Sequence, residues 1–117
     1  YIVVDYKATA KKDDIVALDS KWHEAYKRQM EIYQWLLTKN GLKVSNVGYI
    51  LYCNGNASEP AFEGKLDFRQ TLHSHEGDSS WVYRTIGALY DCLNGKRPEY
   101  NKDCDFCVYN MDQQILK

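Results

Sequence analysis

The sequence predicts a mixed α/β fold in which a small sheet packs against helices. Three observations support it: short apolar or alternating runs at 1–9 and 46–53, a helical repeat of apolar residues over 20–39, and the order of these patterns along the chain. The predicted elements run strand, helix, strand, strand, helix, an order typical of layered α/β domains. At 117 residues the chain has the size of one domain. We therefore expect a single domain over 1–117.

The first predicted strand covers residues 1–9 and opens with the sequence YIVVDYK. Because side chains alternate between the faces of a strand, Asp5 and Lys7 share one face, roughly 7 Å apart at the backbone. The pair has two interpretations. It is either a surface ion pair, worth about 0–1 kcal/mol, or a site in which the carboxylate holds a cation and the ammonium meets an anion. We expect this strand to be central in the sheet.

A helix is predicted over 20–39, after a short excursion of the chain at 10–18. Asp19 and Ser20 are favoured N-cap residues, and Asn40-Gly41 is typical of a helix end. Apolar residues at three- and four-residue spacing predict the buried side of this helix. They are Trp22, Tyr26, Met30, Tyr33 and Leu37.

Gln29 lies on the same side of this predicted helix. A buried amide without hydrogen-bond partners costs on the order of 1–3 kcal/mol. Gln29 therefore either bonds a neighbouring backbone group or points into a polar site, with Tyr33 one turn later on the same side. If the helix packs across the first strand, Gln29 and Tyr33 lie above Asp5 and Lys7.

The remaining predicted elements are two strands, a helix and a tail. Residues 46–53 form the second strand, with an Asn54-Gly55-Asn56 turn after it. The third strand covers about Phe62 to His73. The second helix covers 79–94 and is closed by Gly95, and a tail with no assigned element follows.

Composition limits the class of protein. The hydrophobic share of 44% is that of a packed chain, and the net charge of −1 gives no global basic field that would indicate nucleic acid. The cysteines lack the spacing of a secreted disulfide framework. No apolar run approaches the length of a membrane span. We expect a cytoplasmic protein that does not associate with membranes.

Two segments together resemble a known family. VVDYKAT followed by YKRQMEIYQWLL resembles the PD-(D/E)XK nuclease superfamily, in its RecB-type branch. There, an acidic-x-Lys strand precedes a helix with a Gln-x-x-x-Tyr motif, matched here by Asp5-Tyr6-Lys7 and by Gln29 with Tyr33. Each motif alone is weak, whereas the two in this order and at this distance are fairly specific. The resemblance implies a restriction-endonuclease-like mixed sheet flanked by helices.

The resemblance implies a nuclease that depends on Mg²⁺ or Mn²⁺ and hydrolyses DNA, with RNA as the alternative substrate. Asp5 and the backbone carbonyl of Tyr6 would bind the metal. Lys7 would orient or activate the attacking water and offset charge that develops on the phosphate. Gln29 and Tyr33 would position the substrate strand or order the lysine. Four further basic residues would either contact phosphates or form solvated surface. They are Lys11, Lys12, Lys27 and Arg28.

The family's site also needs an acidic residue from a strand before the Asp-x-Lys strand, and this sequence has none before Asp5. Because the chain opens with Tyr1 inside a predicted strand, we expect it to be the C-terminal part of a nuclease domain, N-terminally incomplete. A substitute ligand would have to be Asp13, Asp14, Asp19 or Asp67. We expect the 117-residue chain alone to bind Mg²⁺ or Mn²⁺ weakly and to cleave nothing.

The tail contains a possible second metal site. Cys104 and Cys107 form a Cys-x-x-Cys segment of the kind that often ends members of this branch, and they supply half of a zinc or iron–sulfur site. His73 and His75 would share a face of the third strand and are candidates to complete a zinc site. Ordinary buried thiols are expected at Cys53 and Cys92.

Two functions are open at this stage. The first is a metal-dependent nuclease, of which this chain is a part. The second is a non-enzymatic nucleic-acid-binding or assembly module with a degenerate nuclease fold. The intact Asp-x-Lys and Gln-x-x-x-Tyr motifs favour the first function, and the missing acid favours the second. The expected partners are DNA or RNA and further domains of the parent protein.

Overall fold

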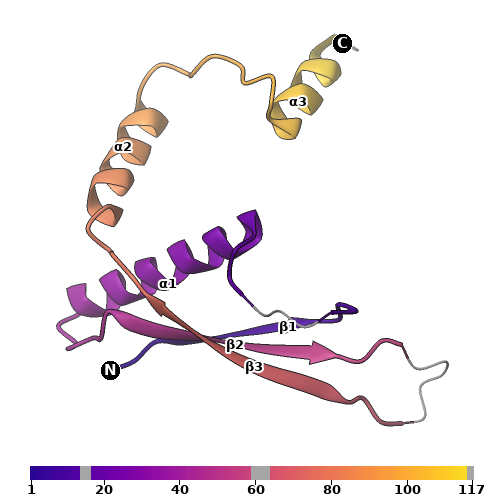
Figure 1. Ribbon diagram of the computed structural model, residues 1–117. Helices are drawn as coiled ribbons and strands as arrows, with labels where there is room; N and C mark the ends of the chain where they lie inside the picture. Colours follow the sequence, from indigo (N-terminus) through magenta and orange to yellow (C-terminus); the bar gives the residue numbers. More distant parts are fainter. Residues whose placement is uncertain (14–16, 59–63, 116–117) are drawn as a thin grey trace. The chain divides into compact units, whose positions relative to one another are not determined.

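The computed structural model describes residues 1–13, 17–58 and 64–115, and it has the predicted mixed α/β class (Figure 1). Its elements are β1 (Val4–Thr9), α1 (Lys21–Lys39), β2 (Val47–Gly55), β3 (Phe68–Glu76), α2 (Val82–Asn94) and α3 (Asp105–Ile115). The chain divides into two compact units, Tyr1–Val82 and Tyr83–Lys117. The first unit contains the sheet and α1.

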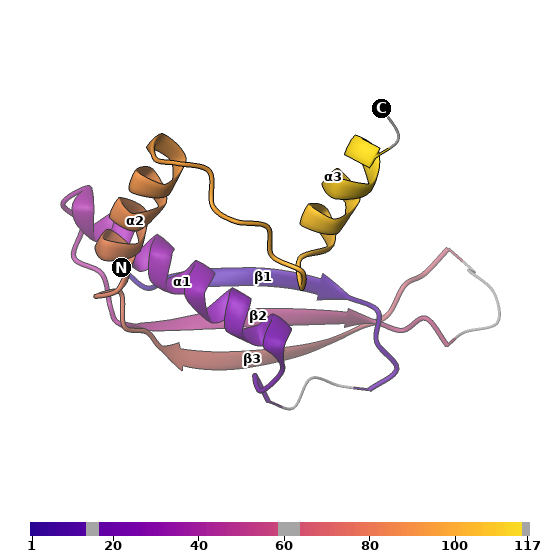
Figure 2. The same ribbon diagram turned by 90° about the horizontal axis from the view of Figure 1, so that it is seen from above.

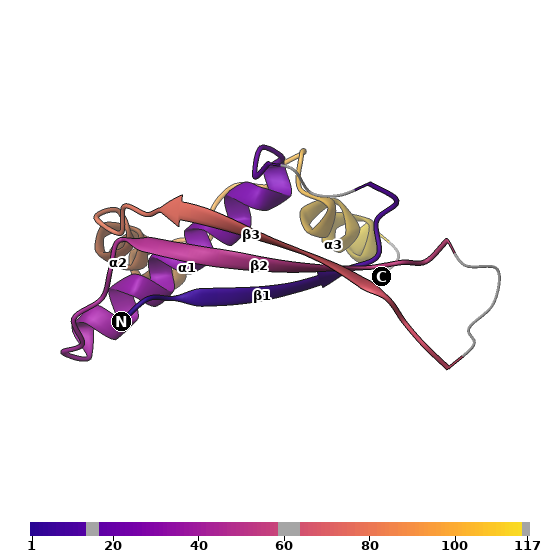
Figure 3. The ribbon, with the colours of Figure 1, turned by 60° about the horizontal axis from the view of Figure 1, so that its bottom comes forward.

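The three strands form one mixed sheet with β2 between β1 and β3 (Figure 3). β1 runs parallel to β2, so that Asp5 lies opposite Ile50 and Lys7 opposite Tyr52. β3 runs antiparallel to β2 and places His73 opposite Ile50. In the described sheet β1 is thus an edge strand, and the prediction that Asp5 and Lys7 lie on a central strand is wrong. The pattern within one strand does not encode how many neighbours it pairs with.

α1 lies across one face of the sheet (Figure 2), and its ends follow the predicted caps. The Ser20 hydroxyl accepts a hydrogen bond from the His23 backbone N–H at 3.4 Å, and the Ser20 N–H donates to His23 Nδ1 at 3.3 Å. This reciprocal pair is a capping box with histidine in the place of the usual acid or amide. After Asn40, Gly41 takes a φ of 82°, which a residue without a Cβ adopts at no steric cost.

The core lies between α1 and the sheet. Its buried members are Val3, Met30, Ile50 and Tyr52. Met30 packs so closely over β2 that a Cβ on Gly48 would collide with the Met30 side chain and lie 3.1 Å from the carbonyl oxygen of Val3. Glycine at position 48 therefore sets how near the helix can approach the strand.

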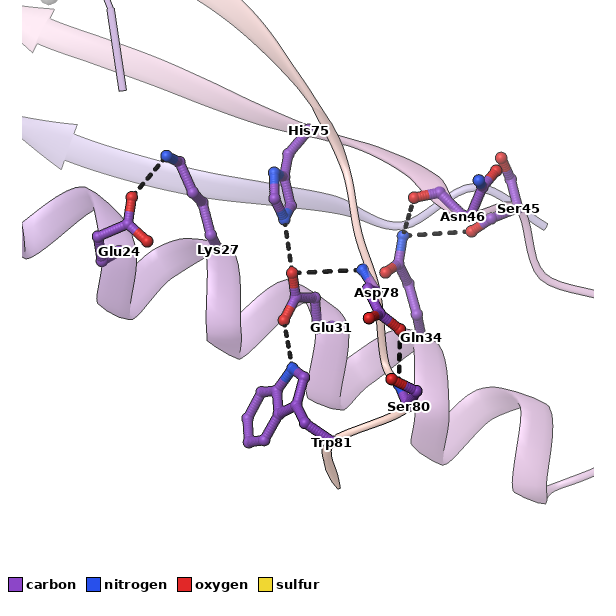
Figure 4. Close-up of polar contacts among 10 residues, drawn as sticks. All are labelled: Glu24, Lys27, Glu31, Gln34, Ser45, Asn46, His75, Asp78, Ser80 and Trp81. Carbon is purple, nitrogen blue, oxygen red and sulfur yellow. Dashed lines mark hydrogen bonds and ion pairs between the residues drawn. The ribbon is translucent and has the colours of Figure 1, made fainter. Parts of the chain in front are cut away.

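The predicted buried side of α1 is partly wrong. Met30 is buried, but Trp22 is 75% exposed and Tyr33 is 38% exposed. His23 and Gln34 are buried instead, and the side chain of each forms hydrogen bonds with the backbone. His23 closes the capping box, and the Gln34 amide donates to two backbone carbonyls, those of Ser45 at 3.2 Å and Asn46 at 2.9 Å (Figure 4).

Several predicted boundaries also need correction. The first strand begins at Val4, and the predicted Asn-Gly-Asn turn is wrong because β2 continues through Gly55. Asn54 is buried in β2, where its side chain bonds the backbone N–H and carbonyl of Lys11 at 2.8 and 2.9 Å. The third strand was predicted from Phe62, which lies outside the described residues. It begins at Phe68 and runs past His73 to Glu76.

The second unit contains most of α2, together with α3. The helix predicted over 79–94 begins at Val82, and α3 was not predicted. The expectation that Cys92 is buried is wrong, since this cysteine is exposed, while Cys53 is buried in β2 as expected. Among the helices of the described residues, none is both long and apolar enough to span a membrane.

Candidate functional site

β1 and α1 together bring the two halves of the motif into contact. Asp5 and Lys7 both face α1, and Lys7 Nζ lies 2.8 Å from Asp5 Oδ2. The two side chains are only 16% and 19% exposed, so this is not a surface ion pair. Lys7 Nζ also donates to Gln29 Oε1 at 2.8 Å. The expectation that Gln29 lies close to Asp5 and Lys7 is therefore confirmed.

Tyr33 extends this chain of contacts toward solvent. Gln29 Nε2 donates to the Tyr33 hydroxyl at 2.6 Å, one helical turn away. The Gln29 amide is thus fixed at both ends, with its oxygen on Lys7 and its nitrogen on Tyr33. These contacts hold the Lys7 ammonium in one place. If Lys7 moved away, the Gln29 oxygen and the Asp5 carboxylate would both lose their partner.

Aromatic rings form the floor beneath Lys7. Its Nζ lies 4.4 Å from the centroid of the Tyr26 ring, within the range of a cation–π contact. The Tyr26 and Tyr52 rings meet edge to face at 6.3 Å, and Tyr52 meets His73 in the same way at 6.0 Å. Burial, with smaller effects of Tyr26 and Asp5, raises the pKa of Tyr52 to about 12. The Tyr52 phenol is therefore neutral at physiological pH and does not serve as a base.

His23 packs against the same aromatic rings. Its ring centroid lies 6.0 Å from that of Tyr52, and its side chain is buried. Burial lowers the pKa of His23, and the positive charge of Lys11 lowers it further against the opposing effect of Asp19. The ring is therefore neutral near pH 7, and its Nδ1 can accept the Ser20 N–H.

A hollow of about 260 Å³ opens beside Lys7. Two cationic side chains line it, Lys7 and Lys11, and it has no carboxylate among its described lining residues. Its walls are aromatic: Trp22, His23, Tyr26 and Tyr52. Lys11 also lines a second hollow of about 430 Å³ at the end of the sheet, together with Lys12 and Arg69. Asp67 also lines that second hollow, so the net positive charge of its lining is smaller.

The structure supplies only part of a divalent-cation site. Asp5 Oδ2 is buried, and the Lys7 ammonium lies 2.8 Å from it, so a cation bound to this carboxylate would have to share it with Lys7. No group of three His, Cys, Asp or Glu side chains that could hold a metal occurs within the described parts of the chain. Since Mg²⁺ takes about six oxygen ligands, these residues do not fit a complete site. The Tyr6 side chain points to the opposite, exposed face of the sheet, and the role of its carbonyl stays a prediction.

The structure describes three of the four substitute acids, Asp13, Asp19 and Asp67, whereas Asp14 lies outside the described residues. Asp19 lies 4.0 Å from His23 Nδ1, and Asp67 forms an exposed ion pair with Lys65 at 3.0 Å. None of the three belongs to a three-ligand group with Asp5.

A polar network that was not predicted joins α1 to β3 and to the loop that follows it (Figure 4). Glu31 is its centre: Oε1 lies 2.9 Å from His75 Nε2, and Oε2 accepts from Trp81 Nε1 at 2.6 Å. The Asp78 backbone N–H reaches Glu31 Oε1 at 3.4 Å. The signal in the sequence is the spacing of polar residues. Lys27, Glu31 and Gln34 lie four and three positions apart, the spacing that apolar residues have on the buried side of a helix. The Nε2 atom of His75 is thus engaged by Glu31, and a role for His75 in a zinc site stays a prediction.

The Cys-x-x-Cys segment lies at the start of α3. The pKa of the Cys104 thiol is lowered, mainly by a hydrogen bond from the Cys107 backbone N–H and to a smaller extent by one with the Cys107 side chain. Both thiols are half-buried and free. Among the described residues, no further His, Cys, Asp or Glu joins Cys104 and Cys107 in a group that could hold a metal. A zinc or iron–sulfur site at these two cysteines stays a prediction.

Comparison of the chain with protein-family models, with curated proteins and with solved structures finds no match. A functional interpretation therefore depends on the residues and their geometry.

Proposed function

We propose that this chain is part of a metal-dependent nuclease that hydrolyses the phosphodiester bonds of DNA. The observation that carries the proposal is the 2.8 Å hydrogen bond from Lys7 to Gln29. It joins the Asp-x-Lys strand to the Gln-x-x-x-Tyr helix, two motifs separated by 22 residues whose joint presence led to the nuclease interpretation. A merely surface lysine would not be held by both a carboxylate and an amide.

The chemistry of Lys7 supports this proposal. Its ammonium is already oriented by Asp5 and Gln29, so it requires little reorganisation when charge grows on a phosphate oxygen. An ammonium has three N–H donors, and the hollow beside it gives a ligand access. The Lys11 side chain in the same hollow and Lys12 in the next one favour a ligand with several negative charges, as a nucleic-acid strand has.

The metal dependence requires ligands that the described residues do not supply. When bound, a divalent cation would polarise the phosphate and lower the pKa of its bound water. Asp5 would be one ligand, and at least one further acidic ligand is required. This requirement, together with the absence of a three-ligand group from the described residues, favours as the second candidate a nucleic-acid-binding or assembly module without catalysis. We also propose a cytoplasmic location, since the cysteines lack the spacing of a secreted disulfide framework.

A cleavage assay separates the two candidates. The full-length gene product and the 117-residue chain are incubated with end-labelled DNA and Mg²⁺, with and without EDTA. We expect chelator-sensitive cleavage by the full-length product, none by the 117-residue chain, and none after Asp5→Asn. Lys65→Ala is the matched control, because Lys65 forms an exposed ion pair with Asp67. A full-length product that binds DNA but never cleaves it would support the binding module instead.

A further inference from the structure

A third hollow, also of about 430 Å³ and here called the Trp81 hollow, adjoins the Gln29–Tyr33 end of the site. Its α1 residues lie three and four positions apart, so they form one side of the helix: Ala25, Arg28, Gln29, Ile32 and Tyr33. Trp81, from the loop between β3 and α2, forms the remaining wall. All of these residues belong to the first compact unit. The volume lies within the range of about 300–1,000 Å³ that is usual for small-molecule sites.

Trp81 is held in place by the network around Glu31. Its Nε1 donates to Glu31 Oε2 at 2.6 Å, and Glu31 Oε1 is in turn bound by His75 at 2.9 Å (Figure 4). The loop also packs tightly on α1, since a Cβ on Gly77 would collide with Gln34 and come within 3.0 Å of Glu31 Cγ. The indole ring is therefore positioned before any ligand arrives, which reduces the ordering cost of binding.

The chemistry of the hollow indicates its ligand. Two aromatic side chains, Trp81 and Tyr33, offer faces on which a flat ring can stack. Arg28 brings a guanidinium, which pairs with phosphate and also stacks on flat rings. The described lining includes no carboxylate that would repel an anion. Gln29 and Tyr33 are shared with the chain of contacts that ends at Lys7, so a strand bound at Lys7 would have its next nucleotides near this hollow.

We propose that the Trp81 hollow binds an unpaired nucleobase of single-stranded DNA, stacked on the indole with its phosphate near Arg28. This inference rests on the proposed function and deepens it, since it names a single strand as the substrate form. Bases in a duplex are already stacked on each other and do not offer a free face, whereas an unpaired base can enter such a site. The hollow therefore distinguishes single strands from blunt duplexes.

The test measures fluorescence anisotropy with a labelled oligonucleotide and with a blunt duplex of the same length, at fixed salt. Loss of one stacking side chain weakens single-strand binding by roughly 5- to 150-fold, and we expect Trp81→Ala to raise the single-strand Kd by that factor. The duplex Kd should change by less than about threefold, since only the unpaired base uses the indole. Trp81→Phe keeps a stacking surface and should retain most of the affinity. Trp35→Ala is the matched control, because Trp35 contacts Lys39 and does not line the hollow.

A second measurement does not depend on the folding of the alanine variant. In a Trp22→Phe, Trp35→Phe protein, Trp81 is the only tryptophan left, and its fluorescence should be quenched by the oligonucleotide but not by the duplex. Unchanged fluorescence, or equal loss of single-strand and duplex affinity in Trp81→Ala, would overturn the inference. Those results would leave the nuclease proposal intact, because the proposal depends on Lys7 and Asp5. Loss of single-strand binding in Trp81→Ala together with no cleavage of DNA by the wild-type full-length product would instead overturn the nuclease proposal alone.

Discussion

Replacement of Lys7 by methionine tests whether the Asp5–Lys7 pair is a buried, functional arrangement or a surface ion pair. Methionine keeps most of the volume and removes the ammonium. Asp5 then stays in a site where its side chain is 16% exposed, and its buried Oδ2 has lost the ammonium that lay 2.8 Å away. Gln29 loses its charged donor at the same time.

The magnitude follows from the burial of the pair. Removing one partner of a fully buried pair costs about 3–5 kcal/mol, and an exposed pair contributes about 0–1 kcal/mol. With exposures of 16% and 19%, the pair lies closer to the buried limit. A lost hydrogen bond from a charged group contributes in the same direction. We expect Lys7→Met to lower the free energy of unfolding by about 2–4 kcal/mol at pH 7.

Urea unfolding followed by tryptophan fluorescence measures this change, because Trp22, Trp35 and Trp81 all lie in the first unit. Lys65→Met is the matched control. Lys65 also pairs with an aspartate two positions away, but that pair is 77% and 68% exposed, so we expect a loss below about 1 kcal/mol. Asp5→Asn combined with Lys7→Met should recover part of the loss, since the unpaired carboxylate is then gone. Equal effects of Lys7→Met and Lys65→Met would refute the reasoning.

Two further predictions concern the packing of α1. Because burial lowers the pKa of His23, its contribution to stability is complete above the ordinary histidine pKa of about 6.5 and is lost as the pH falls below that value toward the lowered pKa of the folded state. Each tenfold difference in proton affinity contributes about 1.4 kcal/mol. His23→Gln, which can keep the capping box, should show a smaller loss of unfolding free energy between pH 7.5 and pH 5 than the wild type, and equal losses would contradict the assignment. Gly48→Ala should cost about 1–3 kcal/mol in urea unfolding through its collision with Met30, whereas Gly87→Ala in α2, where a Cβ meets nothing within 4 Å, should be neutral or stabilising by up to about 1 kcal/mol. A Gly48→Ala protein as stable as the wild type would show that Met30 can move aside.

The features of the fold that depend on local chemistry were predictable. Ser20 and Gly41 mark the ends of α1 through capping and a left-handed φ, both of which are properties of a few adjacent residues. A strand fixes the shared face of Asp5 and Lys7, and a helix fixes the one-turn spacing of Gln29 and Tyr33, but their meeting depended on the further expectation that the helix packs across the strand. The shared face and the one-turn spacing are the part of the site that one sequence can specify.

The features that depend on distant contacts were not predictable. The edge position of β1 is set by strand pairing across the chain, and Asn54 looked like a turn residue until its buried bonds to the Lys11 backbone were visible. Gln34 is buried with its amide donating to two backbone carbonyls. Any polar residue on a helix could be buried in this way, so the sequence does not indicate which one is. Among the described side chains of α3, the large apolar ones are exposed, Phe106 at 82%, so they form no buried side that would predict this helix.

The central claim is that the ammonium of Lys7 acts on charge that develops at a phosphate. Single-turnover cleavage of labelled DNA by the full-length gene product, with binding measured separately, tests it most directly by comparing wild type with Lys7→Ala. A preorganised group of this kind contributes mainly in the transition state, so the cleavage rate should fall by about 100- to 1000-fold while the Kd for DNA changes by less than about threefold. A Lys7→Ala protein that cleaves at nearly the wild-type rate, or whose loss of activity is entirely a loss of DNA binding, would contradict the claim.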